Sequence, residues 1–282
     1  MRKYMKYEIK GSYKFILGIL AIVMIASTII QANVKSSIVD QISMNMTNEP
    51  SGFNAFMMVV SIIVIFGAFL TAFFYIVGSF RKELYEDRGY LTFTLPLTGN
   101  QILGAKIIVA MLWFVVLGAA IAVYNLLLAI ILFGVNWIDI AKEIFSMINS
   151  GALSVGIISG LSSIMALILI YFSMALSRVS IRNKKVGGLW FIVFIILSSL
   201  ASYLVFKISS VVPYFLNLND FKILPYYQLS VLPGFNNGIG DLLILGNNYD
   251  AYINIVGVLS HIVISVVAFL TTGYLIEKKI DL

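Results

Sequence analysis

The sequence predicts an all-α integral membrane protein with six transmembrane helices. Hydrophobic residues make up 60% of the 282 residues and charged residues only 11%, which leaves too little polar surface for a soluble globule of this size. The mean hydropathy of +0.99 points the same way. Six apolar runs are long enough to cross the hydrocarbon core, which takes about 20 residues of helix. These runs are too long, and alternate too little, to be the strands of a barrel.

The six runs are predicted as membrane helices in one transmembrane domain that covers residues 1–282. Their expected bounds are residues 15–32, 53–80, 107–133, 151–176, 186–206 and 252–276. In the fourth run, Gly156 and Gly160 form a G-x-x-x-G pattern that predicts a close helix contact, either within the chain or between two copies.

The distribution of basic residues predicts that both termini are cytoplasmic, because cytoplasmic loops retain Lys and Arg. All but four of the 19 Lys and Arg residues fall on one predicted side, in the N-terminal segment, the loop 81–106, the loop after the fourth run and the C-terminal tail. The net charge of +6 is therefore a topology signal, and it favours contact with anionic membrane lipid rather than nucleic acid. The loop 207–250 is expected on the outer side.

The N-terminal residues 1–14 have a pattern of their own. Lys3, Lys6, Lys10 and Lys14 form one basic stripe on a helix, which predicts an interfacial helix that turns into the first span. The alternatives are a frayed basic tail, or a cleaved signal peptide that includes the first apolar run. That run is longer than a usual signal-peptide core, so a permanent span is preferred.

The residues of the predicted spans argue against an enzyme. No Asp, Glu, Lys or Arg lies in the interior of a span, and cysteine is absent, so we expect no catalytic residues and no metal site. The single histidine, His261, is expected to bond a Ser, Thr or Tyr of a neighbouring helix, with a substrate contact as the alternative. The same lack of membrane carboxylates weighs against an ion-coupled carrier.

The loop 81–106 is the charge-dense segment between long apolar runs. Helix formers precede Gly89, an extended stretch leads to Pro96, and Thr98 and Gln101 have the spacing of a capping box that would begin the third span. We therefore expect a compact helix-turn-helix knuckle with charges of both signs, suited to contact with a soluble partner. A plain solvated loop is the alternative.

This loop resembles that of a known family, the type-2 permeases of ATP-binding-cassette exporters. The resemblance is carried by an acidic pair before a glycine, a Leu-Pro turn and a boundary lysine, and it extends to the topology of six spans with cytoplasmic ends. The matching residues are Glu86, Asp87, Arg88, Gly89, Tyr90, Leu91, Leu95, Pro96, Leu97, Ile102, Leu103, Gly104 and Lys106.

The resemblance implies that the knuckle docks on a separate ATPase subunit and that two permease copies, identical or paralogous, form the exporter. The expected ATPase-coupling residues are Glu83, Glu86, Asp87, Arg88, Gly89, Tyr90, Leu91 and Pro96. ATP and magnesium would bind the partner subunit, and no cofactor is expected in this chain. Residues 99–107 come nearest to a phosphate-binding loop, but the lysine is displaced and Ile107 replaces the required hydroxyl.

The resemblance also implies a substrate route along the second and fifth spans. Its candidate residues are Thr71, Tyr75, Ser198, Ser202 and Tyr203. Such a route suits an amphipathic or hydrophobic substrate, such as a drug, a peptide antibiotic or a lipid, although hydroxyls in membrane helices more often bond neighbouring helices.

The expected function is thus that of the membrane subunit of an ATP-driven exporter in a bacterial cytoplasmic membrane. The alternatives are a membrane-anchored scaffold or sensor without transport, and a channel or secondary carrier.

Overall fold

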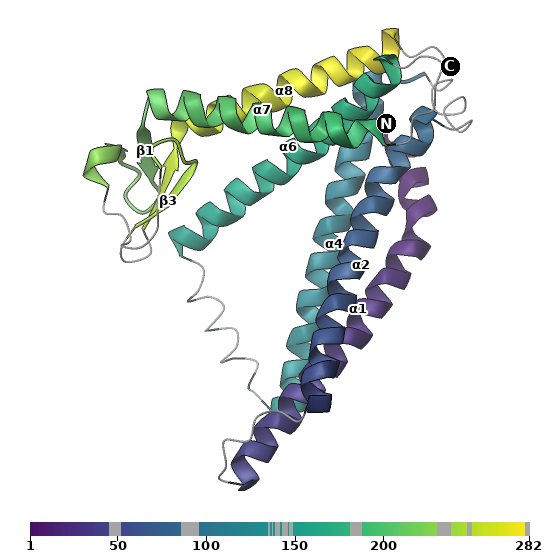
Figure 1. Cartoon of the computed structure of the whole chain (residues 1–282), viewed down its shortest axis with the longest axis vertical. Coiled ribbons are helices and arrows are strands. Elements are labelled where there is room, and N and C mark those ends of the chain that lie inside the picture. Colours follow the sequence, from purple (N-terminus) through teal and green to yellow (C-terminus); the bar gives the residue numbers. More distant parts are fainter. Residues whose placement is uncertain are drawn as a thin grey trace. The chain divides into compact units, whose positions relative to one another are not determined.

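A computed structural model describes residues 1–44, 52–85, 96–134, 136, 138, 142, 146, 149–180, 188–229, 238–246 and 250–279 (Figure 1). The fold is mostly helical, as the sequence predicts. Its helices are α1 (Arg2–Met44), α2 (Gly52–Tyr85), α4 (Gly99–Phe133), α6 (Ser150–Ser180), α7 (Leu189–Val211) and α8 (Ile255–Lys278).

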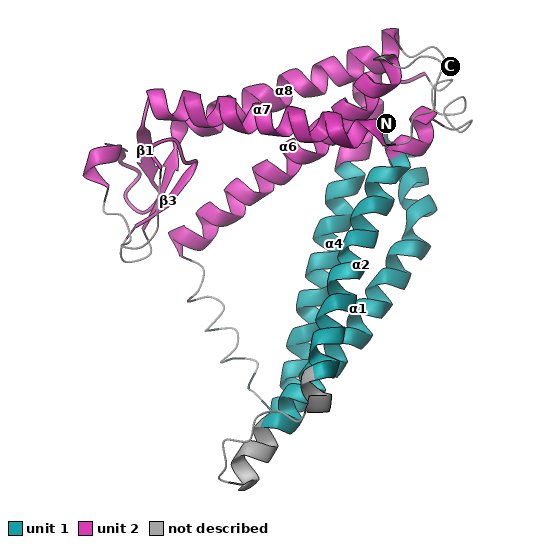
Figure 2. Ribbon diagram, viewed as in Figure 1, with its two compact units in different colours: residues 1–79, 108–143 teal, residues 80–107, 144–282 magenta. Residues whose placement is uncertain are grey.

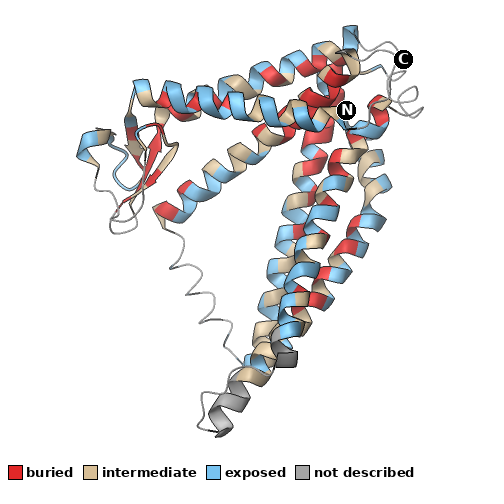
Figure 3. Ribbon diagram, in the orientation of Figure 1, coloured by how far each residue is buried: buried red, intermediate tan, exposed pale blue. Residues whose placement is uncertain are grey.

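Six helices in the described part of the chain are long and apolar enough to cross a membrane, as expected of a multi-pass membrane protein. Many of their apolar side chains are exposed or only partly buried (Figure 3). In α7, only 11% of the most apolar stretch is buried within the chain. Such surfaces need lipid or another protein around them.

The helix α1 is continuous from Arg2 to Met44. Residues 1–14, expected as a separate interfacial helix, form its first turns. The basic stripe and the first apolar run therefore belong to one helix of 43 residues.

The chain divides into two compact units, shown in different colours in Figure 2. Unit 1 comprises Met1–Ser79 and Ile108–Glu143, and unit 2 comprises Phe80–Ile107 and Ile144–Leu282. The boundary crosses α2 and α4, so the ends of these helices that flank the loop 81–106 belong to unit 2.

Unit 1 holds α1 and the greater parts of α2 and α4, which are joined by polar contacts between apolar surfaces. The Trp113 indole donates to Ser12 Oγ at 2.8 Å, and Thr28 and Tyr124 share a hydrogen bond of 2.7 Å. Gln31 Nε2 donates to Asn125 Oδ1 at 2.8 Å. Hydrogen bonds of this kind stabilise helix contacts in a membrane, where water does not compete for the groups.

Unit 2 contains a small sheet that the all-α prediction did not include. Its strands are β1 (Tyr214–Asn217), β2 (Ile223–Pro225), β3 (Leu243–Leu245) and β4 (Ala251–Asn254). All pairs are antiparallel and the order is β2-β1-β4-β3. Phe215, Ile244 and Tyr252 form its buried core.

The start of the sixth span was predicted at residue 252, but residues 252–254 lie in β4 and α8 begins at Ile255. The periodicity of an apolar run does not separate a buried strand from a helix. Here β4 is a central strand, paired on one side with β1 and on the other with β3. Asn254 ends the strand and caps the helix, since its side chain accepts the Gly257 N–H at 2.8 Å.

The G-x-x-x-G pattern of α6 lies on an uncovered helix surface. A Cβ built on Gly156 or Gly160 meets no atom within 4 Å. Among the described residues, the close contact is therefore not made within the chain at these two glycines, and the alternative contact between two copies stays a prediction.

Candidate functional site

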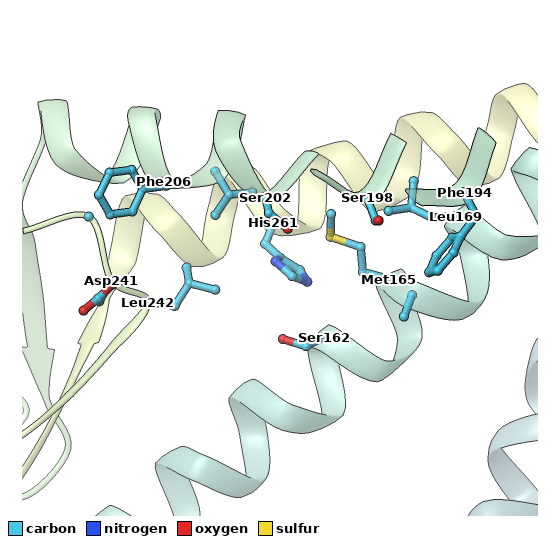
Figure 4. Close-up of a pocket in the computed structure, with 13 residues that line it drawn as sticks. Ser162, Met165, Leu169, Phe194, Ser198, Ser202, Phe206, Asp241, Leu242 and His261 are labelled. Carbon is cyan, nitrogen blue, oxygen red and sulfur yellow. The ribbon is translucent and has the colours of Figure 1, made fainter. Parts of the chain in front are cut away.

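A pocket of about 350 Å³ lies in unit 2 between α6, α7, α8 and the turn that precedes β3 (Figure 4). Its walls are mostly apolar. Residues that line it include Met165, Leu169, Phe194, Val205, Phe206 and Leu242. The volume falls in the range of small-molecule sites, which are apolar cavities with a few placed polar groups.

Two close contacts with α7 lie next to the sheet, at one end of this pocket. A Cβ on Gly240 would lie 2.6 Å from the Phe206 carbonyl oxygen, and one on Gly257 would lie 2.5 Å from Ser209 Oγ. Asn254 is fully buried beside them, and its amide donates to the Ser209 carbonyl at 3.4 Å. The ends of α7 and α8 are thereby held together at the sheet.

His261 is the central polar group of the pocket. It projects from α8 toward the space between α6 and α7 (Figure 4) and is only 9% exposed. Its Nε2 is buried and has no hydrogen-bond partner among the described residues. The expected partner, a hydroxyl of a neighbouring helix, is therefore not found at this nitrogen.

Three serines supply the other polar groups near the ring. Ser198 and Ser202 of α7, both predicted candidates, line the pocket together with Ser162 of α6. The Ser198 hydroxyl donates to the Ile195 carbonyl of its own helix at 3.1 Å. Asp241 lines the sheet end, where its carboxylate accepts the Gly238 N–H at 2.6 Å.

A second polar site lies at the two helix ends that the segment 86–98 connects. We call these helix ends, residues 80–85 of α2 and 99–106 of α4, the loop base. Here Lys106 Nζ lies 2.8 Å from Glu83 Oε1, and the two side chains are only 3% and 10% exposed. Glu83, predicted to face an ATPase, therefore has its carboxylate buried against a lysine.

The loop base packs on α6, on the C-terminal side of the pocket residues of that helix. The rings of Phe80 and Tyr171 lie 4.5 Å apart, centroid to centroid. The Tyr85 hydroxyl donates to the Met174 carbonyl at 3.2 Å, and the Arg178 guanidinium lies 5.8 Å from the Tyr85 ring centroid.

The loop base also contacts α8. The Gly99 N–H donates to Glu277 Oε2 at 3.3 Å, and a Cβ on Gly99 would lie 2.2 Å from the Gly273 carbonyl oxygen. The predicted capping box is confirmed: Thr98 N–H donates to Gln101 Oε1 at 3.2 Å and Gln101 N–H donates to Thr98 Oγ1 at 3.3 Å.

Two helices thus join the loop base to the pocket. On α6, the pocket residues end at Leu169 and the loop-base contacts begin at Tyr171. On α8, His261 and Gly273 are separated by three turns, or about 18 Å at 1.5 Å per residue. A displacement of the loop base would therefore reach the pocket residues of α6 and α8 through continuous helix.

None of the other predicted residues that the structure describes is among those that line the pocket. Thr71 and Tyr75 belong to unit 1, where the Thr71 hydroxyl bonds its own helix and the Tyr75 ring stacks on Phe15 at 4.0 Å. Tyr203 is exposed, with Lys207 Nζ 5.9 Å from its ring centroid. Pro96 is an exposed bend. Glu86, Asp87, Arg88, Gly89, Tyr90 and Leu91 lie outside the described residues.

Two polar groupings escaped the sequence analysis. The Glu83–Lys106 pair could have been suspected from opposite charges at the two ends of one loop between apolar helices. Gln31 and Asn125 could have been noticed as amides inside predicted spans. Among the described residues, no group of three or more His, Asp or Glu side chains is arranged to hold a metal ion.

Compared with protein-family models, curated proteins and solved structures, the chain matches none. The features that bear on function are therefore the loop base, the pocket and the two helices that connect them.

Proposed function

We propose that this chain is the membrane-spanning subunit of an ATP-driven exporter. In this proposal both termini and the loop 81–106 are cytoplasmic, and the loop docks on a separate ATPase subunit that binds ATP and magnesium. Two such chains, identical or paralogous, form the complete transporter. The proposal assigns no chemistry to the chain itself, which converts movement of the ATPase into movement of its helices.

The observation that carries the proposal is the connection between the loop base and the pocket. The buried Glu83–Lys106 pair ties the ends of α2 and α4 together. The contacts of Tyr85 with α6 and of Gly99 with α8 fix this pair to two of the three helices that line the pocket. Rigid helices of this kind transmit a small shift at one end to a site at the other.

The composition of the pocket supports a hydrophobic or amphipathic substrate. Its walls are apolar with hydroxyls from Ser162, Ser198 and Ser202, and no Lys or Arg is found among the described residues of its lining. A site of this composition suits a drug-like molecule, an apolar peptide antibiotic or a lipid.

The test is charge reversal in the loop. Glu86→Lys and Asp87→Lys, alone and together, are compared with Asp220→Lys, which makes the same charge change in an exposed turn next to the sheet. ATP hydrolysis by the reconstituted complex with its native ATPase should fall about tenfold or more in the double variant, because reversed charges at an interface cost well over 1.4 kcal/mol. The Asp220 variant should behave as the parent.

Insertion and thermal stability of the double variant should be unchanged, which separates lost coupling from lost folding. The proposal fails if ATP hydrolysis and transport stay at the parental rate in the double variant. It also fails if the purified chain moves solute across vesicles without a second subunit, as a carrier would.

A further inference from the structure

The sheet of unit 2 is attached directly to two helices that are apolar enough to cross a membrane. β1 begins three residues after α7 ends at Val211, and Asn254 both ends β4 and caps α8. The Tyr214 N–H donates to the Val212 carbonyl at 2.9 Å, so the chain turns between α7 and β1 instead of extending. The sheet is therefore held close to these two helix ends (Figure 1).

The length of α7 places its end near the surface of a bilayer. Its 23 residues span about 34 Å, and the hydrocarbon core is about 30 Å thick, with a headgroup layer of about 6 Å on each side. Tyr203 and Lys207 of α7 are exposed, and Lys207 Nζ lies 5.9 Å from the Tyr203 ring centroid. Both residue types favour the boundary between hydrocarbon and water. The β1–β2 hairpin, which starts at Tyr214, is thus within reach of the headgroups.

One face of the β1–β2 hairpin belongs to the buried core of the sheet. Phe215 of β1 pairs with Leu224 of β2, and Leu224 packs on the core together with Tyr226 and Leu229. Phe215 itself is fully buried. Because neighbouring residues of a strand point to opposite faces, the residues on either side of Phe215 belong to the other face.

The other face of the hairpin consists of apolar side chains that the described residues leave open. Tyr214 pairs with Pro225 and Leu216 pairs with Ile223, and we call these four residues the hairpin face. Tyr214 and Ile223 are 50% and 59% exposed, and the other two are partly buried. In water, the open face of an antiparallel hairpin usually carries polar side chains. A face of this composition needs a cover other than water.

Phe221 extends this apolar surface to the tip of the hairpin. Its side chain is 75% exposed, and its backbone φ of 52° lies in the left-handed region, where glycine and asparagine are usual. A bulky side chain in this conformation destabilises the turn. The turn alone therefore does not account for a phenylalanine here, whereas a contact of the ring with its surroundings does.

We propose that the hairpin face and Phe221 form a membrane-contact surface, seated in the headgroup layer of the bilayer at the ends of α7 and α8. This surface follows directly on the apolar surface of α7, where Ile208 and Val211 are 42% and 78% exposed. Aromatic residues are favoured at this level of a bilayer, because their rings bury apolar area beside polar headgroups. The sheet then rests on lipid as well as on the two helices.

The contact is apolar rather than electrostatic. Asp220 and Lys222 at the hairpin tip have opposite charges, lie 3.7 Å apart and are largely exposed. The charges of this described pair cancel, so the tip does not select an anionic headgroup. For the same reason, an acidic or basic soluble protein would find no complementary charge there.

The first experiment compares two adjacent residues on opposite faces of the hairpin. Because the chain contains no cysteine, Ile223→Cys and Lys222→Cys each give the full chain a single site for an NBD dye. Each labelled chain is placed in phosphatidylcholine nanodiscs. The dye in the Ile223→Cys variant should emit at shorter wavelength and lose intensity when nitroxide-labelled phosphatidylcholine is included. The dye in the Lys222→Cys variant should emit at longer wavelength and lose intensity with iodide in the water.

The same pattern is expected in phosphatidylglycerol nanodiscs. The proposal is overturned if the two dyes are equally sensitive to iodide, because the hairpin face then lies in water. Shielding of the Ile223→Cys dye from both iodide and nitroxide lipid would also overturn it, since a second copy or another protein would then cover the face. Lipid quenching that occurs only with the anionic lipid would refute an apolar contact.

The second experiment tests Phe221 in the Ile223→Cys background. Phe221→Asn removes the ring and suits the left-handed backbone, so the turn is retained. Quenching by nitroxide lipid should fall toward the value of the Lys222→Cys variant. The control Tyr227→Ser removes an 82% exposed ring that is not part of the hairpin face, and it should leave the quenching unchanged. Parental quenching in Phe221→Asn would refute the role of Phe221.

These measurements use no nucleotide and no second subunit, so they remain valid if the exporter proposal fails. They also report depth in the bilayer rather than the side of the membrane, so the result does not depend on the orientation of the chain.

Discussion

At the residue scale, the Glu83–Lys106 pair is the most consequential polar contact of unit 2. Both side chains are almost fully withdrawn from solvent. Buried charges are costly to desolvate, and a pair repays that cost only while both partners are present. The pair therefore contributes less to net stability than to holding α2 and α4 in one register at the loop base.

Removal of one partner should expose this cost. Lys106→Met leaves the Glu83 carboxylate buried without its lysine and should destabilise the chain by about 3 kcal/mol. The double variant Glu83→Gln/Lys106→Met removes both charges and should be more stable than Lys106→Met alone. Thermal unfolding in detergent, followed by tryptophan fluorescence, measures both. A double variant that is no better than the single one would show that the ion pair is not the source of the loss.

At the element scale, helix ends and helix crossings organise unit 2. The helices α4, α6 and α8 are each capped at their start by a side chain that accepts a backbone N–H. The capping residues are Thr98, Asn149 and Asn254, respectively. Only Asn254 is fully buried, and it also joins β4 to the end of α7. A cap in this position holds the sheet end of the pocket as well as starting a helix.

The two asparagine caps offer a direct comparison. Asn149→Ala removes a cap in a more exposed setting and should cost about 1 kcal/mol. Asn254→Ala removes a cap and also leaves the Ser209 carbonyl without its side-chain donor, so it should cost about 2 to 3 kcal/mol. Unfolding midpoints in detergent test the order. Equal losses in the two variants would indicate that Asn254 acts as a simple cap.

The crossing of α4 and α8 depends on glycine. Gly99→Ala would place a methyl group 2.2 Å from the Gly273 carbonyl oxygen, a backbone atom that moves only if the helices separate. We expect a loss of about 1 to 3 kcal/mol, the usual cost of overpacking. Gly118→Ala in the same helix meets no atom within 4 Å and should be neutral or slightly stabilising. A melting temperature for Gly99→Ala at or above that of Gly118→Ala would rule out the tight crossing.

At the scale of the whole molecule, the topology is open to a direct chemical test because the chain contains no cysteine. Tyr227→Cys places a thiol at a site that is 82% exposed beside the sheet. Lys82→Cys places one at an exposed position of the loop base. With both termini cytoplasmic, a membrane-impermeant maleimide should label Tyr227→Cys on intact cells and Lys82→Cys only after permeabilisation. The opposite labelling pattern would show that the chain crosses the membrane in the reverse orientation.

The sequence predicted the parts of the fold that depend on local pattern. Six helices follow from apolar length, and the start of α4 follows from the spacing of Thr98 and Gln101. The sheet could not be predicted in the same way, because strands of three or four residues are defined by partners far along the chain. The burial of Glu83 could not be predicted either, because a carboxylate at a helix end is solvated or buried according to what packs on it.

The candidate site likewise contains residues that the sequence predicted and residues that only the structure revealed. Ser198 and Ser202 were selected from the sequence and do line the pocket, whereas the selection of Thr71 and Tyr75 brought in residues of the other unit. The places of Ser162 and His261 in the pocket lining required the packing of α6 on α8.

By itself the sequence determined that this protein is a helical membrane protein, because transfer of long apolar segments from water to lipid depends only on their composition and length. The tertiary structure alone decided that a lone histidine lines a pocket and that a glutamate and a lysine close the base of a loop. Hydrogen bonds and ion pairs depend on distances of a few ångströms between side chains far apart in sequence, and only the packing of the helices sets those distances.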